Sequence, residues 1–164
     1  MEDKLKSLIK TSSFLVLMLA LIGDAFGQAT VLPVPADTSF NVKSTWLKEK
    51  KKFPFIEMVE PHLPEGVRAD RNVIYVTLEE TPYGKRELFA DIFYPDDKDS
   101  GPFPGVVLVH GGGWKSGSRS HLVPMAQQLA SKGYVAVAVE YRLSPEARYP
   151  AAVWDVKAAI LWLK

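Results

Sequence analysis

Residues 110–114, with the sequence His-Gly-Gly-Gly-Trp, follow directly after a run of four apolar residues at 106–109. The run is mostly β-branched and predicts a strand that is buried on both faces. Glycine lets the backbone turn sharply with its N–H groups uncovered, and helical spacing resumes after Ser120. A strand, then exposed amides, then a helix can hold the oxyanion that develops during acyl transfer, so the pattern favours acyl-transfer chemistry.

Two other interpretations of this glycine loop are weaker. A phosphate-binding P-loop has a glycine immediately before its lysine, whereas Trp114 precedes Lys115 and Ser116 here. A purely structural turn would rarely use three consecutive glycines, because each one loses much backbone entropy on folding. His110 is a candidate catalytic base, but we expect it to fix the loop through hydrogen bonds instead.

No complete catalytic set is visible in the rest of the sequence. It contains no G-x-S-x-G nucleophile elbow and no cysteine, which excludes a thiol nucleophile and a thiolate metal site. For Ser116, Ser118 and Ser120, which lie near His121, we expect loop hydrogen bonding and helix capping. The three histidines follow no metal-ligand spacing, so we expect neither a metal nor another cofactor.

The composition is that of an ordinary globular protein and fits one domain. Of the 164 residues, 47% are apolar and 24% are charged, and the formal net charge is +1. A nucleic-acid partner would require a basic face, and this balance gives no electrostatic support for one. The short cluster Lys50-Lys51-Lys52 is expected to be a solvated face or loop.

The N-terminal segment 1–27 is typical of a secretory signal peptide. Lys4, Lys6 and Lys10 form a positive region before the apolar run 12–22, which is too short for a bilayer span. Small residues at positions 25 and 27 predict cleavage after Gly27. We therefore expect a secreted or periplasmic protein with no membrane association after cleavage.

The remaining sequence divides into a proline-rich N-terminal extension, residues 28–70, and an α/β domain, residues 71–164. We expect the apolar residues of the extension to lie as a short helix or irregular segment against the domain. In the domain, the spacing predicts a hairpin of strands 72–78 and 88–94, a strand 106–109, a helix from about 120 to 132, a strand 134–139 and a helix 150–164. Strands that alternate with helices favour parallel pairing.

The apolar spacing also predicts which side chains the two helices bury. These are Leu122, Met125, Ala126 and Leu129 in the first helix and Val153, Val156, Ile160 and Leu163 in the second. Among the acidic residues, Asp155 is a better candidate than Asp91 for a buried ion pair. Its expected partner is Arg142, which gives the pair a structural role.

Three segments together resemble the esterase/lipase branch of the α/β-hydrolases. They are the loop 110–114, the stretch Tyr141-Arg142-Leu143-Ser144-Pro145-Glu146, and the stretch Tyr-Pro-Ala-Ala-Val-Trp-Asp-Val-Lys-Ala-Ala at 149–159. The resemblance extends over about residues 72–164 and includes BD-FAE-like feruloyl and acetylxylan esterases and hormone-sensitive-lipase-like carboxylesterases. It implies a mostly parallel sheet with a Ser-Asp/Glu-His triad. It also implies that Gly112 and Gly113 donate backbone N–H groups to the oxyanion hole.

The resemblance further implies how the strands are ordered and how much of the enzyme is present. In the family the fourth strand inserts between the second and third, which would leave strand 106–109 at the edge of an incomplete sheet. The nucleophile elbow, the acid and the histidine of the family would all follow Lys164. We therefore expect the N-terminal half of an α/β-hydrolase sheet, inactive on its own.

The implied function is that of a secreted serine ester hydrolase. Its substrate would be a small acyl ester or a polysaccharide ester, with acetyl or feruloyl groups on plant polysaccharide as candidates. Two alternatives stay open. One is a non-catalytic secreted fragment or decayed gene product. The other is an amide hydrolase of the formamidase type, because some formamidases share the H-G-G-x-W pattern.

Overall fold

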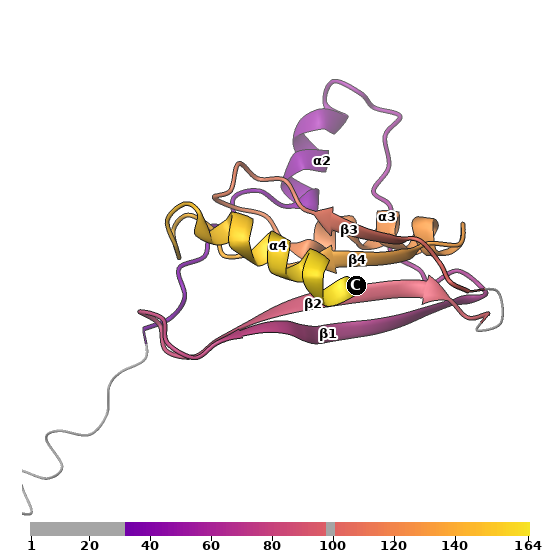
Figure 1. The fold of residues 1–164 in the computed structure, drawn as a ribbon. Helices are drawn as coiled ribbons and strands as arrows, with labels where there is room; N and C mark the ends of the chain where they lie inside the picture. Colours follow the sequence, from indigo (N-terminus) through magenta and orange to yellow (C-terminus); the bar gives the residue numbers. More distant parts are fainter. Residues whose placement is uncertain (1–31, 98–100) are drawn as a thin grey trace, which may run out of the picture. The chain divides into compact units, whose positions relative to one another are not determined.

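The computed structural model describes residues 32–97 and 101–164, which contain four strands and four helical segments (Figure 1). In chain order these are α2 (Val42–Lys50), β1 (Val67–Leu78), β2 (Arg86–Pro95), β3 (Gly105–Val109), the 3-10 helix η2 (Arg119–Leu122), α3 (Val123–Ala130), β4 (Val135–Val139) and α4 (Ala151–Leu163). None of the helices in these two ranges combines the length and apolarity that a membrane crossing requires. The predicted signal peptide, residues 1–27, lies outside the described residues.

The four strands form one mixed sheet with the order β1-β2-β4-β3. β1 and β2 pair antiparallel as the predicted hairpin, around a turn closed by hydrogen bonds between Thr81 and Gly84. β4 pairs antiparallel with β2 and parallel with β3. The α/β fold class and the insertion of the fourth strand between the second and third are confirmed. The antiparallel hairpin and the parallel pairing of β3 with β4 agree with the prediction, and the four strands make a mixed sheet because β2 runs antiparallel to both of its neighbours.

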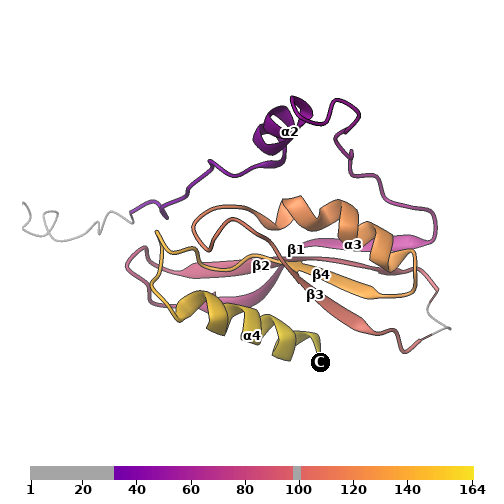
Figure 2. The same cartoon turned by 90° about the horizontal axis from the view of Figure 1, so that it is seen from above.

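Helices α3 and α4 cover opposite faces of this sheet (Figure 2). Successive side chains of a strand point to opposite faces, and β4 shows this alternation directly. Ala136 packs in a cluster that includes Ala126 of α3, whereas Val137 packs in a cluster that includes Ala159 of α4. From β2, the fully buried Phe93 joins the first of these clusters. Each face of the sheet therefore has its own core, which anchors the helix that follows β3 and the helix that follows β4.

The strand that precedes the glycine loop lies at an edge of the described sheet. There β3 pairs only with β4, and Val109 is 39% exposed. The strand 106–109 is less buried than predicted, because Leu108 and Val107 pack against the clusters on the two faces but are only partly buried. The strand that is buried on both faces is β4, in which residues 136–139 are all buried. Both strands are short apolar runs, so periodicity alone could not tell the central strand from the edge strand.

The buried face of α3 is rotated relative to the predicted one. Ala126 is buried as expected, but its buried companions are Val123, Gln127 and Ala130. Met125, which was predicted to be buried, is 55% exposed. Pro124 stands in the first turn of the helix, as expected for a residue that lacks an N–H donor.

The helix α4 approaches the sheet through small and paired side chains rather than through its largest apolar ones. Asp155 and Ala159 are buried, while Val153 and Ile160, predicted to be buried, are 39% and 43% exposed. Leu163 does pack against the sheet. It lies so close to β3 that a Cβ built on Gly105 would be 2.9 Å from Leu163 Cδ2. A helix whose small side chains face the sheet can come close to it, and its larger apolar side chains then point outward.

The first strand begins at Val67, earlier than the predicted start at residue 72. The pairing register shifts between Asp70 and Val73, and Asn72 has a positive φ of 56°. An irregularity of this kind interrupts the alternation of side chains along a strand. The apolar alternation in the sequence therefore became visible only after the interruption.

The N-terminal extension forms α2 and an irregular segment against the domain, as predicted. Asn41 caps α2, because its side chain accepts a hydrogen bond from the Ser44 N–H at 2.9 Å. Trp46 Nε1 donates a hydrogen bond to the Ile56 carbonyl at 3.3 Å, which ties the irregular segment to the helix. The Phe40 ring meets the His121 ring of η2 edge-on, with centroids 5.4 Å apart.

Candidate active site

Gly112 is the residue around which the loop after β3 turns. Its φ is +127°, and its carbonyl accepts hydrogen bonds from the Lys115 N–H at 3.2 Å, from the Ser116 N–H at 3.1 Å and from the Ser116 hydroxyl at 3.2 Å. A Cβ built on Gly112 would overlap the Ser116 carbonyl oxygen. Only glycine fits this position without movement of the backbone.

The two amides predicted to hold an oxyanion are left unused by this turn. Gly113 continues the turn with a φ of +62°, and Trp114 follows with a φ of +63°. Within residues 32–97 and 101–164, the N–H groups of Gly112 and Gly113 have no hydrogen-bond acceptor. A Cβ built on Gly113 would have no atom within 4 Å, so the space beside it is open. The assignment of these amides to an oxyanion hole stays a prediction, and the conformation is compatible with it.

A fourth glycine closes the loop, and the sequence analysis did not identify it. Gly117 has a φ of +104°, and a Cβ there would overlap the Gly111 carbonyl oxygen and lie 2.6 Å from His110 Nδ1. The end of the loop therefore packs directly on its beginning. The sequence offered only a single glycine between Ser116 and Ser118 as a signal, and that pattern is typical of many loops.

His110 fixes the base of the loop, as the sequence analysis expected. Its side chain is buried, and Nδ1 lies 2.9 Å from the Gly111 carbonyl oxygen. A carbonyl only accepts, so this contact places the proton on Nδ1. The ring stacks on Tyr141 with centroids 4.4 Å apart, and the Tyr141 hydroxyl donates to the His110 carbonyl at 2.8 Å.

A row of aromatic rings connects the N-terminal extension to the glycine loop. Phe40 contacts His121, and the His121 and His110 centroids are 6.3 Å apart. His110 stacks on Tyr141, whose ring centroid is 5.4 Å from that of Trp114. Burial lowers the pKa of both His110 and His121 below the ordinary value of 6.5. The neutral imidazoles are thus part of the packing around the loop.

The stability of the full-length protein is expected to fall as the pH drops below about 6.5, because of these two histidines. The unfolded chain takes up protons near the ordinary pKa, whereas the folded protein takes them up only at lower pH. The unfolded state therefore binds more protons in that window, and the free energy of unfolding decreases until the folded pKa values are passed. Urea denaturation at several pH values measures this slope. His110→Phe and His121→Phe should each make it shallower, and an unchanged slope in both variants would contradict the assignment.

The predicted ion pair between Arg142 and Asp155 is present. Arg142 donates from Nη2 to Oδ1 at 2.7 Å, from Nε to Oδ2 at 2.9 Å and from its backbone N–H to Oδ2 at 3.0 Å. The hydrogen bonds to Asp155 raise the pKa of the Arg142 guanidinium. Two residues further on, the Ser144 N–H donates to the Trp114 carbonyl at 2.8 Å. The ion pair thus attaches the loop after β4 to α4, and this loop in turn supports the glycine loop through the Ser144–Trp114 hydrogen bond.

Asp91 is a second buried carboxylate with ion-pair partners, and the sequence analysis ranked it below Asp155. It accepts from Arg119 Nε at 3.0 Å and from the Asn72 N–H at 3.0 Å, and Arg71 Nε lies 3.1 Å from it. Arg119 also donates to Glu140 at 2.8 Å. The sequence signal that could have identified Asp91 is a carboxylate inside an otherwise apolar strand, because a buried charge requires a partner.

The loop serines have the structural roles that were predicted for them. Ser116 is buried and bonds within the turn, while the Ser118 hydroxyl accepts from the Ser120 N–H at 3.3 Å and caps η2. In the part of the chain that the structure describes, no group of three or more His, Cys, Asp or Glu residues is placed to hold a metal ion. The site therefore consists of a backbone loop and its supports.

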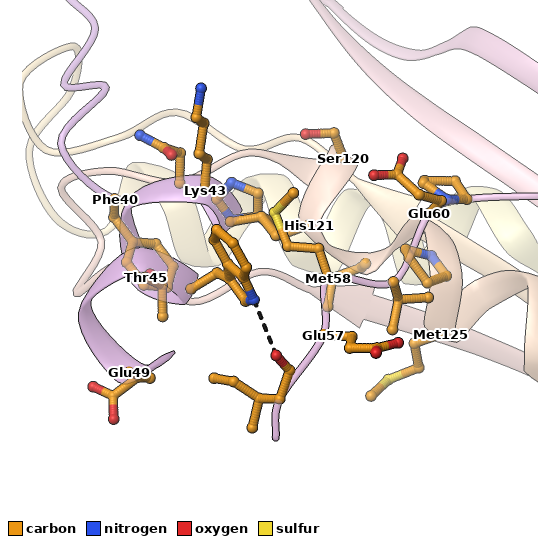
Figure 3. Close-up of a pocket in the computed structure, with 18 of the residues that line it drawn as sticks. Phe40, Lys43, Thr45, Glu49, Glu57, Met58, Glu60, Ser120, His121 and Met125 are labelled. Carbon is orange, nitrogen blue, oxygen red and sulfur yellow. Dashed lines mark hydrogen bonds between the residues drawn. The ribbon is translucent and has the colours of Figure 1, made fainter. Parts of the chain in front are cut away.

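A pocket of about 780 Å³ opens beside the glycine loop, between the N-terminal extension and the domain (Figure 3). Its walls come from α2, from the segment 56–61 and from the η2–α3 region, and Gly111 of the glycine loop also lines it. A Cβ built on Gly111 would have no atom within 4 Å. The volume falls in the range of small-molecule sites, which are about 300–1,000 Å³.

Comparisons with known proteins agree with this architecture. Residues 90–164 match the family model described as BD-FAE. Esterase LipC of Mycobacterium tuberculosis is 35% identical over 103 residues, which cover 62% of this chain and 26% of the relative. The chain thus spans about a quarter of the length of that esterase.

Two solved esterases resemble the structure. An inhibited esterase B from Lactobacillus rhamnosis has a TM-score of 0.53 and 26% identity, over 74% of this chain and 36% of the other. Thermogutta terrifontis esterase 2, phosphonylated by cyclosarin, has a TM-score of 0.50 and 29% identity, over 63% of this chain and 37% of the other. The chain is similar to α/β-hydrolase esterases, and the described residues resemble an N-terminal portion of their fold.

Proposed function

We propose that the protein is a carboxylic-ester hydrolase in which the N–H groups of Gly112 and Gly113 hold the oxyanion. The observation that carries the proposal is the conformation of the turn. The Gly112 carbonyl is engaged by Lys115 and Ser116, whereas the two amides have no acceptor in the described ranges. Amides that are fixed in place before the reaction stabilise a developing charge without reorganisation.

The proposed reaction proceeds through an acyl-enzyme. A serine hydroxyl attacks the ester carbonyl carbon, and its proton passes through a histidine to the departing alcohol. Water then releases the acid by the same route. In both steps the carbonyl oxygen becomes an oxyanion near the two amides. Because Ser116 and Ser118 are engaged within the loop and at the η2 cap, we propose neither of them as the nucleophile.

Export and a polysaccharide substrate are further parts of the proposal. The lysines before the apolar run 12–22, together with the small residues at 25 and 27, support secretion or transport to the periplasm. The resemblance of residues 110–114, 141–146 and 149–159 to feruloyl and acetylxylan esterases supports acetyl or feruloyl esters of plant polysaccharide as substrates. An exported esterase would meet such polymers outside the cell.

The proposal is tested on the full-length protein with p-nitrophenyl butyrate and an alkyl phosphonate. We expect ester turnover, its loss on treatment with the phosphonate, and a covalent adduct of one phosphonate per chain in the mass spectrum. The phosphonylated state of Thermogutta terrifontis esterase 2 makes this class of inhibitor a suitable probe. A folded protein that shows neither turnover nor an adduct would overturn the proposal. Turnover of an aryl formamide without ester turnover would point to amide hydrolysis instead.

A further inference from the structure

The helix α2 and the turn that follows it carry a basic surface, which we call the lysine face. Five of the ten residues 43–52 are lysines, and all five are exposed: Lys43, Lys48, Lys50, Lys51 and Lys52. Glu49 is the only acidic residue among these ten. Across residues 32–97 and 101–164, the only ion pair of these lysines joins Lys48 to Glu49 at 4.0 Å. In that part of the chain, the other four ammonium groups therefore have no carboxylate partner.

The lysine face lies on the side of α2 that is turned away from the pocket beside the glycine loop. Successive side chains of a helix are about 100° apart, so residues 43, 47 and 50 share one face. Thr45 and Glu49, on the other side of the helix, line the pocket (Figure 3). Leu47 and Lys50 do not line it, whereas Lys43 lies at the border and does. The lysine face is thus separate from the pocket but adjoins it.

Aromatic rings are interleaved with the ammonium groups of the lysine face. Lys50 Nζ lies 4.3 Å from the Trp46 ring centroid, and Lys52 Nζ lies 5.2 Å from that of Phe53. The Phe53 ring meets the Phe55 ring edge-on, with centroids 6.1 Å apart, and Phe55 is 81% exposed. An exposed ring offers an apolar surface on which the C–H face of a sugar can stack. The surface therefore combines positive charge with a platform for a sugar ring.

The arrangement of charge on α2 favours a dissolved polymer over a membrane surface as the partner. A helix that lies on a bilayer needs an apolar face that is separate from its charged face. In α2, the exposed Leu47 lies between Lys43 and Lys51 on the same face. The other two apolar side chains of the helix, Val42 and Trp46, line the pocket. The lysine face thus has no apolar stripe of its own to insert into lipid.

We propose that the lysine face binds an acidic polysaccharide, one whose sugar units carry carboxylate groups. The inference rests on the proposed function, which supplies the polysaccharide class of the partner, and the lysines add that this polymer is anionic. Each exposed contact is weak, but contacts along one polymer reinforce each other because every later contact is intramolecular. Since the lysine face adjoins the pocket, a polymer held there keeps its ester groups close to the glycine loop.

The test measures binding to the full-length protein by isothermal titration calorimetry, with sodium polygalacturonate as the probe. The matched control ligand is the same polymer after its carboxylates have been reduced to alcohols. We expect binding to the acidic polymer and much weaker binding to the reduced one. Binding to the acidic polymer should also be lost in about 1 M salt, where the Debye length is only about 3 Å. Equal binding to the two polymers would overturn the inference.

The lysines are tested by a triple variant in which glutamine replaces Lys50, Lys51 and Lys52. Binding to polygalacturonate should weaken about tenfold, as expected for the loss of three exposed ion pairs. The control variant has the same change at three exposed lysines outside the lysine face: Lys85, Lys132 and Lys157. Lys157 is a close match, because its Nζ lies 4.3 Å from the Trp154 ring centroid, as Lys50 does from Trp46. The control variant should bind as the unsubstituted protein does.

Equal weakening in the two triple variants would overturn the inference, because the effect would then come from net charge alone. Lys43→Gln combined with Lys48→Gln provides a second variant of the lysine face, in case the first fails to fold. Binding to vesicles that contain an anionic phospholipid, with none to polygalacturonate, would assign the face to a membrane and overturn the inference. Because binding is measured without turnover, the two proposals fail separately. A protein that binds the polymer but hydrolyses no ester would overturn the proposed function alone.

Discussion

Replacing Gly112 by alanine is expected to lower kcat/KM of the full-length protein for p-nitrophenyl butyrate by at least 10²-fold, since the loss of one oxyanion donor costs about 10²–10³ in rate. The added Cβ would overlap the Ser116 carbonyl oxygen, and alanine resists the φ of +127°. The turn must open, which displaces both the Gly112 and the Gly113 amides. Steady-state kinetics should show the loss mainly in kcat, because the oxyanion exists only after attack has begun.

Gly133→Ala is the matched control for this substitution. Gly133 also has a positive φ, +87°, but a Cβ there would have no atom within 4 Å, and the residue follows α3 rather than β3. Backbone strain alone should cost about 1–2 kcal/mol of stability and leave kcat/KM intact. If the two variants lost activity equally, or if Gly112→Ala stayed fully active, the loop would not hold the oxyanion.

The parts of the site that could be predicted from the sequence depend on local rules. The alternation of strands and helices fixed the fold class, and a run of glycines after a strand located the turn at Gly112. The pairing of Arg142 with Asp155 was also accessible. The two residues flank a short connection into α4, so a buried carboxylate there has a nearby cation to meet.

The parts that could not be predicted depend on partners that are distant in the sequence. Asp91 is satisfied by Arg119 from beyond the glycine loop, and Gly117 is required because it packs on His110. Neither contact leaves a periodic trace in the sequence. The predictions of which helix faces are buried were wrong for a related reason. A 3.6-residue pattern marks the apolar side chains of α4, but the sheet accepts the small Ala159 and the paired Asp155 and leaves Ile160 exposed.

Replacing Asp155 by asparagine is expected to lower the free energy of unfolding of the full-length protein by about 3 kcal/mol, the lower end of the range for breaking a buried ion pair. Asparagine keeps the shape of the side chain but removes the charge that Arg142 faces. Asp155 is 2% exposed, whereas the Arg142 side chain retains 19% exposure, so water can relieve part of the cost. Typical domains are stable by only about 5–15 kcal/mol, so urea denaturation resolves such a loss easily.

An exposed ion pair at the start of β2 provides a control that separates this effect from the loss of an ordinary salt bridge. Lys85 and Glu87 are 3.1 Å apart, with side chains 56% and 32% exposed. Lys85→Met should therefore change the stability by less than about 1 kcal/mol. Asp155→Asn should also reduce ester turnover beyond its effect on folding, because Arg142 anchors the loop from which the Ser144 N–H bonds the Trp114 carbonyl. Equal stability losses in the two variants would show that the Arg142 pair is no more than a surface contact. A destabilised but fully active Asp155→Asn protein would show that the loop anchored by Arg142 does not position the glycine loop.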